Sequence, residues 1–194
     1  MSGGRIYIVR HGNTFDSSDT VLRVGRKTNL PLSISGVKQA EKLALAFRNT
    51  HFEAAYSSDL KRTRQTIEII LDGQPYQLAD FLTEIDYGPD EGRPEAEVIS
   101  RVGMKALKDW DENSIPPPGW LVDTQNLKTA WQAFFANCSA QSNTLVVTSN
   151  GVARFLLESV RGGENATRKL KTGAYGVVEI SATGPRLVSW NNQP

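Results

Sequence analysis

The chain has 194 residues, of which 39% are hydrophobic and 22% are charged, and its 22 Lys and Arg residues nearly balance its 21 Asp and Glu residues. These values are typical of a soluble globular protein and argue against a broad basic face for nucleic acid. No apolar run reaches membrane-spanning length, and no charged leader precedes an apolar stretch. The only cysteine, Cys138, cannot form an internal disulfide, which favours the cytoplasm. We therefore expect one cytoplasmic domain over residues 1–194 that binds neither nucleic acid nor membrane.

Hydrophobic periodicity and turn residues predict the order of elements. The N-terminal half is expected to contain a buried strand at 5–9, a long polar loop at 12–33, a helix at 34–48, a strand at 54–57, a helix capped by Ser58 or Asp59 and closed by Gly73, and a strand at 75–80. The C-terminal half is expected to contain a Gly- and acid-rich loop at 81–93, a helix near 94–110, a stiff proline loop at 116–119, a helix at 122–138, a strand at 144–148, a helix at 152–160, and a hairpin of strands 177–180 and 187–190.

Alternation of strands and helices predicts an α/β fold. We expect a three-layer α/β/α sandwich whose central sheet is mostly parallel, with helices on both faces. The terminal hairpin would add antiparallel strands at one edge, where a homodimer could form. Turns at the carboxyl ends of parallel strands gather on one rim, so the segments that follow residues 5–9, 54–57 and 144–148 should lie together there.

Arg10-His11-Gly12 follows the first strand and is the most informative motif of the chain. It places a guanidinium and an imidazole where a parallel sheet opens its ligand crevice, and His11 is one of only two histidines, the other being His51. Guanidinium groups match phosphate oxygens, and an imidazole can attack phosphorus and hold it covalently. These residue types therefore point to phosphate chemistry that depends on one histidine.

Three later segments bring complementary groups to the same rim. Arg62 follows the turn Ser57-Ser58, Glu84 lies in an acid-rich loop, and Asn150-Gly151 follows the strand at 144–148. A carboxylate can protonate a leaving oxygen, and a helix N-terminus favours an anion. We expect Arg62 to point into the pocket and Arg64 to point outward.

The chain resembles the histidine phosphatase superfamily, also called the phosphoglycerate mutase-like or acid phosphatase-like family. The resemblance covers most of the chain and depends on five segments in the family's order. They are Ile8-Val9-Arg10-His11-Gly12, Pro31 to Ala40, Tyr56 to Thr66, Leu82 to Gly88, and Val146 to Arg154.

The resemblance implies a role for each matching residue. His11 would become a phosphohistidine, Arg10 and Arg62 would hold the phosphoryl oxygens, and Glu84 would be the general acid and then the base. No cofactor and no metal are implied.

Two positions depart from the family's pattern. Asn150 stands where the family normally has a second histidine, and Ser17 stands where it often has a phosphate-binding asparagine. An amide still donates a hydrogen bond but carries no positive charge, so Asn150, Gly151 and Ser17 are expected phosphate contacts. Replacing Asn150 by His is expected to raise phosphate affinity if the imidazole fits.

Less specific roles for the same residues stay open. Arg62 could be a solvated helix residue, Glu84 a simple loop carboxylate, and Asn150 a helix cap with or without a phosphate contact. Arg154 is as compatible with a structural role as with a functional one.

The sequence favours a metal-independent phosphatase that acts on small phosphorylated molecules or on an exposed phosphohistidine or phosphoserine. A pseudoenzyme that only binds phosphate or a phosphoprotein is the second hypothesis, and the retention of Glu84 argues against it. A phosphoglycerate mutase-type isomerase and a structural homologue that mainly dimerises are the remaining alternatives.

Overall fold

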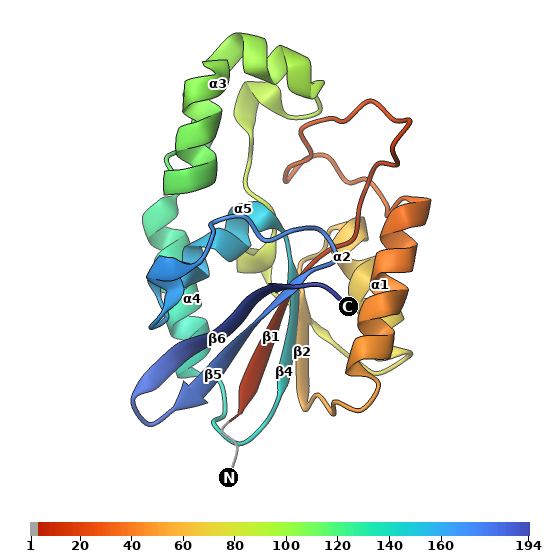
Figure 1. The fold of residues 1–194 in the computed structure, drawn as a ribbon, viewed down its shortest axis with the longest axis vertical. Helices are drawn as coiled ribbons and strands as arrows, with labels where there is room; N and C mark the ends of the chain where they lie inside the picture. The colour runs from red at the N-terminus through yellow and green to blue at the C-terminus, as the bar shows by residue number, and fades with distance from the viewer. Residues whose placement is uncertain (1–3) are drawn as a thin grey trace.

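A computed structural model describes residues 4–194 (Figure 1). Over these residues a six-stranded sheet has the order β3-β2-β4-β1-β5-β6. The strands are β1 (Arg5–Arg10), β2 (Ala54–Ser57), β3 (Gln77–Leu78), β4 (Thr144–Thr148), β5 (Tyr175–Ser181) and β6 (Gly184–Asn192). Strands β3, β2, β4 and β1 are parallel, whereas β5 pairs antiparallel with β1 and β6 pairs antiparallel with β5. The mostly parallel sheet with an antiparallel edge is therefore confirmed.

Helices cover both faces of the sheet, which confirms the three-layer α/β/α architecture. They are α1 (Ile34–Phe47), α2 (Lys61–Leu71), α3 (Glu95–Asn113), α4 (Thr124–Ala136) and α5 (Asn150–Ala153). Figure 1 shows α1 and α2 on one side of the sheet, α4 and α5 on the other, and α3 beyond the end of the strands.

The apolar run of β1 is explained by burial on both faces of the sheet. Ile6 and Ile8 belong to the core under α4, which also contains Trp131. Val9 belongs to the other core, together with Leu43 of α1 and Ile67 of α2.

Several predicted boundaries are wrong. Helix α2 begins at Lys61, and neither Ser58 nor Asp59 caps it; its N-cap is Leu60, without a side-chain hydrogen bond. The Ser58 hydroxyl bonds to Thr63 Oγ1 at 2.6 Å, and the Asp59 carboxylate accepts from Arg64 at 3.2 Å. Tertiary and local side-chain contacts thus use the groups that the sequence suggested as caps.

The other differences concern helix continuity and strand length. Helix α3 runs to Asn113 with a kink at Gly103, whose φ of 80° interrupts the helical backbone. The expected helix at 152–160 begins at Asn150 and becomes a 3-10 turn over Arg154–Glu158. The expected strand at 75–80 shrinks to Gln77–Leu78, and both strands of the terminal hairpin are longer than predicted.

A helix that spans a membrane must be both long and almost entirely apolar. Within residues 4–194, no helix combines that length with sufficient apolar character.

Candidate active site

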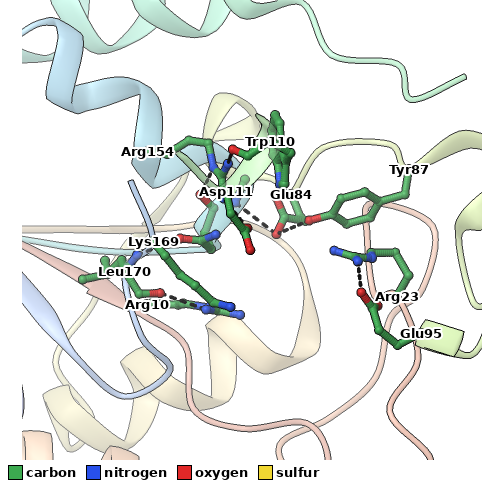
Figure 2. Close-up of polar contacts among 12 residues, drawn as sticks. Arg10, Arg23, Glu84, Tyr87, Glu95, Trp110, Asp111, Arg154, Lys169 and Leu170 are labelled. Atoms are coloured by element: carbon green, nitrogen blue, oxygen red, sulfur yellow. Dashed lines mark hydrogen bonds and ion pairs between the residues drawn. The ribbon is translucent and has the colours of Figure 1, made fainter. Parts of the chain in front are cut away.

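Three parallel strands end at one rim of the sheet, and the candidate site lies there. The His11 backbone N–H donates to Thr148 O at 3.1 Å, which joins the residue after β1 to the end of β4. A cavity of about 460 Å³ opens at this rim (Figure 2). Its wall includes side chains from distant parts of the chain, namely Arg10, His11, Glu84, Asn150 and Lys169.

The His11 side chain is a neutral imidazole whose Nε2, which carries a lone pair, faces Arg62. The ring is only 6% exposed, and Nδ1 lies 2.7 Å from Gly12 O, a contact that places the ring proton on Nδ1. Burial holds the His11 pKa well below its usual 6.5, and the nearby charges of Arg62 and Arg10 lower it further. Nε2 therefore keeps its lone pair, which is the form that a nucleophile needs.

The backbone around His11 requires glycine at the next position. A Cβ on Gly12 would lie 2.4 Å from Gly36 O, because the loop after β1 passes directly against the start of α1. The Gly12 N–H donates to Thr66 Oγ1 of α2 at 3.2 Å. The tight packing of this turn fixes the imidazole between α1 and α2.

Arg62 lies next to His11 and is completely buried, so it is not a solvated helix residue. Its Nε donates to His11 Nε2 at 3.2 Å, and its two terminal nitrogens donate to Thr28 O and Gly25 O at 3.0 and 3.2 Å. Burial lowers the pKa of Arg62, while the Glu84 carboxylate acts in the opposite direction. Arg64, by contrast, is exposed and pairs with Asp59 and Glu68, as the sequence predicts.

Arg10 is the second guanidinium beside His11. Its Nη1 donates to Leu170 O at 2.8 Å, and its buried Nε has no partner within residues 4–194. Burial lowers the pKa of Arg10, and the Glu84 charge opposes that shift. An orphaned donor of a buried cation, at the wall of a cavity, is suited to an anionic ligand.

Glu84 lies across the cavity and is 4% exposed. Its Oε1 accepts from the Ile85 N–H at 2.9 Å, and its Oε2 accepts from the Tyr87 hydroxyl at 3.4 Å and from the Gly151 N–H at 3.3 Å. Burial and the Glu84 charge raise the pKa of Tyr87, so the phenol keeps the proton that it donates (Figure 2). Glu84 is therefore a fixed carboxylate of the site, not a free loop acid.

Asn150 lies at the cavity but does not cap the helix. The N-cap of α5 is Ser149, and Asn150 Oδ1 accepts from the Leu170 N–H at 2.8 Å. This contact leaves the amide nitrogen, a donor, as the polar atom of the side chain that a phosphate could use. The interpretation of Asn150 as a simple helix cap is wrong.

The structure separates two other predicted phosphate contacts from the cavity. Ser17 is exposed and lines an adjoining hollow, not the cavity, although the two share Asn13, Phe15 and Val21 in their walls. The Gly151 N–H donates to Glu84, and a Cβ at Gly151 would lie 2.1 Å from Glu84 Oε1. Gly151 therefore makes room for the carboxylate, and Ser17 is not among the residues that line the cavity.

Arg154 has a structural position behind the cavity wall. Its guanidinium lies 3.8 Å from the Trp110 ring centroid and donates to Trp110 O, and its Nε donates to Asn150 O at 3.4 Å. Burial lowers its pKa to about 10. Arg154 thus connects α3 to the start of α5.

Sequence reasoning missed part of the wall. Trp110 and Asp111 near the end of α3 line the cavity, as does Lys169 from the segment before β5. Arg23 also lines it, paired with Glu95 and lying over the rings of Tyr87 and Trp120. Trp110 lies at the end of a helix that the sequence predicts, but no motif marks any of these four residues as part of a site.

A metal site needs several ligating side chains close together. Across residues 4–194, no group of three or more His, Cys, Asp or Glu side chains is arranged to hold a metal ion.

The fold and the site define an α/β protein in which a buried imidazole and several cations lie at the carboxyl ends of parallel strands. Comparison with family models then identifies the family. The model of the histidine phosphatase superfamily (branch 1) matches residues 6–193, so the chain belongs to that superfamily.

Individual relatives agree with this assignment. The chain is 33% identical to fructose-2,6-bisphosphatase TIGAR from Bos taurus over 141 residues, which cover 70% of this chain and 50% of that protein. It spans about half the length of the first curated relatives that it matches.

Two solved structures show the same fold. The mycobacterial glucosyl-3-phosphoglycerate phosphatase has a TM-score of 0.80 at 17% identity, covering 98% of this chain and 100% of that one. The alpha-ribazole phosphatase from Shigella flexneri has a TM-score of 0.76 at 22% identity, covering 97% and 96%. At these identities the likeness concerns the fold alone.

Proposed function

We propose that the chain is a phosphatase that hydrolyses phosphoric monoesters or phosphohistidine through a phosphohistidine on His11. The observation that carries the proposal is the neutral, buried imidazole of His11, whose Nε2 lies beside Arg62 and whose cavity also holds Arg10 and Glu84. Phosphoryl transfer needs positioning and charge neutralisation, and this set of groups supplies both.

The first half-reaction follows from these positions. A phosphoryl group in the cavity takes over the Arg62 donor that now contacts Nε2, and this frees the lone pair for in-line attack on phosphorus. The Nε2–P bond forms while the bond from phosphorus to the leaving oxygen breaks. That oxygen takes its proton from Glu84, which must enter this step in its acid form.

Hydrolysis of the intermediate uses the same residues in reverse roles. The Glu84 carboxylate takes a proton from water, the water oxygen attacks phosphorus, and the Nε2–P bond breaks to release inorganic phosphate. Arg10 and Arg62 offset the charge that the phosphoryl oxygens carry in both steps. No step requires a metal or a cofactor.

Asn150 replaces, in this proposal, the second histidine that the family normally carries. Its amide can donate to a phosphoryl oxygen, but it brings no charge. Loss of a single oxyanion donor costs roughly a hundred- to a thousandfold in rate, and Asn150 keeps a donor, so we propose slow or narrowly specific turnover.

The substrate scope follows from the cavity and from what the relatives act on. The cavity of about 460 Å³ suits a small phosphorylated molecule, and the relative TIGAR is named as a fructose-2,6-bisphosphatase. We include an exposed phosphohistidine or phosphoserine on a protein, and we propose a cytoplasmic setting because a single cysteine suits a reducing compartment.

Parallel assays of the wild type and His11→Ala on a panel of phosphate esters and phosphohistidine test the proposal. Release of phosphate by the wild type and by His51→Ala, but not by His11→Ala, is the expected result. His51 is exposed and far from the cavity wall, so it is the matched control.

The pseudoenzyme hypothesis makes the opposite prediction for turnover. If no panel member is hydrolysed above background while phosphate or vanadate still raises the melting temperature, the chain is a phosphate-binding module. If neither turnover nor a thermal shift occurs, the structural homologue is favoured.

A further inference from the structure

The cations of the cavity wall differ in what already neutralises them. Arg23 is paired with Glu95, and Arg10 donates to a backbone carbonyl. Lys169 lines the same cavity and is exposed, and none of the ion pairs found within residues 4–194 includes it. Asp111, a carboxylate of the wall, has its recorded ion pair with Arg154 at 3.9 Å. Lys169 is therefore a cation available to an anionic ligand.

The backbone beside Lys169 is fixed to the site by two of the site's own residues. The Leu170 N–H donates to Asn150 Oδ1, and Leu170 O accepts from Arg10 Nη1, both at 2.8 Å. Leu170 itself is fully buried, and Figure 2 shows Lys169 next to Leu170 and Arg10. Asn150 therefore holds the peptide group that joins Lys169 to Leu170, and Arg10 holds the next one, which joins Leu170 to Lys171.

Contacts further along the segment fix its course. The Lys171 N–H donates to Asn191 Oδ1 at 2.8 Å, and the Gly173 N–H donates to the carbonyl oxygens of Arg10 and His11 at 3.2 Å. Asn191 Nδ2 also donates to Lys169 O at 2.8 Å, so the position of the Lys169 backbone is set by the end of β1, by α5 and by β6. Only the flexible side chain is left to adapt to a ligand.

Charge balance in the cavity indicates what Lys169 does there. A bound phosphoryl group spreads negative charge over three oxygens, and the Glu84 and Asp111 carboxylates line the same cavity. Three donors of Arg62 are already directed at His11 and at two carbonyl oxygens, and the Asn150 amide carries no charge. Lys169 supplies a further mobile positive charge on the cavity wall and so offsets the shortage of free cationic donors.

We propose that Lys169 binds the phosphoryl group in the cavity, and that Asn150 positions Lys169 by holding the Leu170 backbone. The proposal deepens the proposed function, because it assigns a phosphate-binding residue and a positioning residue to the same site. Lys169, 19 positions after Asn150, thus supplies the positive charge that the Asn150 side chain lacks.

Vanadate and inorganic phosphate binding to the full chain tests the proposal without depending on turnover. Lys169→Met should weaken the dissociation constant about ten- to a hundredfold, the range for losing one hydrogen bond to a charged group. Lys169→Arg should recover most of the affinity, because it restores the cation. Lys171→Met is the matched control, since Lys171 is exposed on the same segment but does not line the cavity.

Salt dependence separates a charge contact from a structural effect. Affinity of the wild type, Lys169→Arg and Lys171→Met should fall with ionic strength, whereas Lys169→Met should show a shallower fall. An unchanged dissociation constant in Lys169→Met, in a wild type that binds vanadate and hydrolyses esters, would overturn this inference and leave the proposed function standing. A wild type that binds neither anion would overturn both.

A double-mutant cycle tests the role of Asn150. If Asn150 positions Lys169, the loss caused by Lys169→Met should be clearly smaller in an Asn150→Ala background than in the wild type. Additive losses from two variants with wild-type circular dichroism would show that Asn150 acts independently of Lys169. If Asn150→Ala does not fold, Asn150→Ser, which is shorter and should not reach Leu170, replaces it in the cycle.

Discussion

The buried imidazole of His11 makes the stability of the protein depend on pH in a defined way. The pKa of His11 lies well below 6.5 in the folded protein because of burial and of the Arg62 and Arg10 charges, whereas in the unfolded chain it returns to about 6.5. Below pH 6.5 the unfolded state therefore takes up a proton that the folded state refuses. Stability must fall as pH decreases from about 6.5 toward the lower pKa of the folded state.

The size of this effect follows from proton linkage. At pH 5.5 protonation favours the unfolded chain by RT ln 11, about 1.4 kcal/mol, whereas at pH 7.5 the same contribution is below about 0.1 kcal/mol. While His11 stays neutral in the folded state, the wild type should thus lose about 1.4 kcal/mol more than His11→Gln between these two pH values. Other groups titrate in both proteins, so the difference between the proteins isolates His11.

Urea unfolding at pH 7.5, 6.5 and 5.5 measures this difference. His51→Gln is the control and should behave like the wild type, because the exposed His51 lies outside the site. Equal losses of stability in the wild type and in His11→Gln would refute the account of a desolvated imidazole held neutral by two guanidinium groups.

Three further substitutions probe the site and the residues packed around it. Glu84→Gln should lower turnover by about a hundredfold or more, the usual loss for a general acid, while the dissociation constant for vanadate changes little; steady-state kinetics and vanadate titration separate the two. Gly151→Ala places a methyl group 2.1 Å from Glu84 Oε1 and should cost about 1–3 kcal/mol of stability as well as turnover, measured by urea unfolding and phosphate release. Trp120→Phe removes the indole N–H that donates to the buried Asp90 carboxylate at 2.7 Å, and urea unfolding should show a loss of about 1–3 kcal/mol; no loss would mean that Arg101 alone satisfies Asp90.

Parts of the fold were predictable because their signals are local. Strands β1, β2 and β4 are short apolar runs bounded by turn residues, and their predicted limits agree with the structure to within one residue. Helix α1, predicted at 34–48, begins after the side-chain cap Ser33 and agrees to within one residue, whereas α4, predicted at 122–138, begins after Asp123 and is two residues shorter at each end. Signals of this kind depend on neighbours a few residues away.

Boundaries that depend on which partner a polar side chain takes were not predictable. Asp59 is of a residue type that often caps helices, yet its carboxylate pairs with Arg64. Asn150 precedes a helix and is of a residue type that favours caps, yet its side chain bonds to the backbone of Leu170, 20 residues later. Propensity cannot show which of several possible partners a short polar side chain will take.

The candidate site likewise contains residues that the sequence predicted and residues that it did not. His11, Arg10, Arg62, Glu84 and Asn150 were placed together because parallel strands end at one rim, and the structure brings these five residues to one place. Ser17 was selected by its offset from His11, but the loop carries it to another hollow. Lys169 lies in a polar segment without periodicity, and tertiary contacts of its own carbonyl oxygen with Asn191 and of Leu170 with Asn150 and Arg10 bring it to the cavity.

The contact between Asn150 and Leu170 changes what replacing Asn150 by His should do. On charge alone, a second imidazole would strengthen phosphate binding. A protonated imidazole, however, has only donors and cannot accept the Leu170 N–H, which is buried with the rest of Leu170. A neutral imidazole could accept this bond, but it would bring no charge.

Asn150→His therefore gains a cation only by leaving the buried Leu170 N–H without an acceptor. We expect a loss of about 1–3 kcal/mol of stability, and this loss should increase as the pH falls and the new histidine becomes protonated. The affinity for vanadate should not improve, because freeing Leu170 also releases Lys169. Urea unfolding and vanadate titration at pH 6 and pH 8 measure both effects, with Asn150→Gln as the uncharged control. Tighter vanadate binding at pH 6 with unchanged stability would show that the site accepts a second imidazole, and that Leu170 does not depend on the amide.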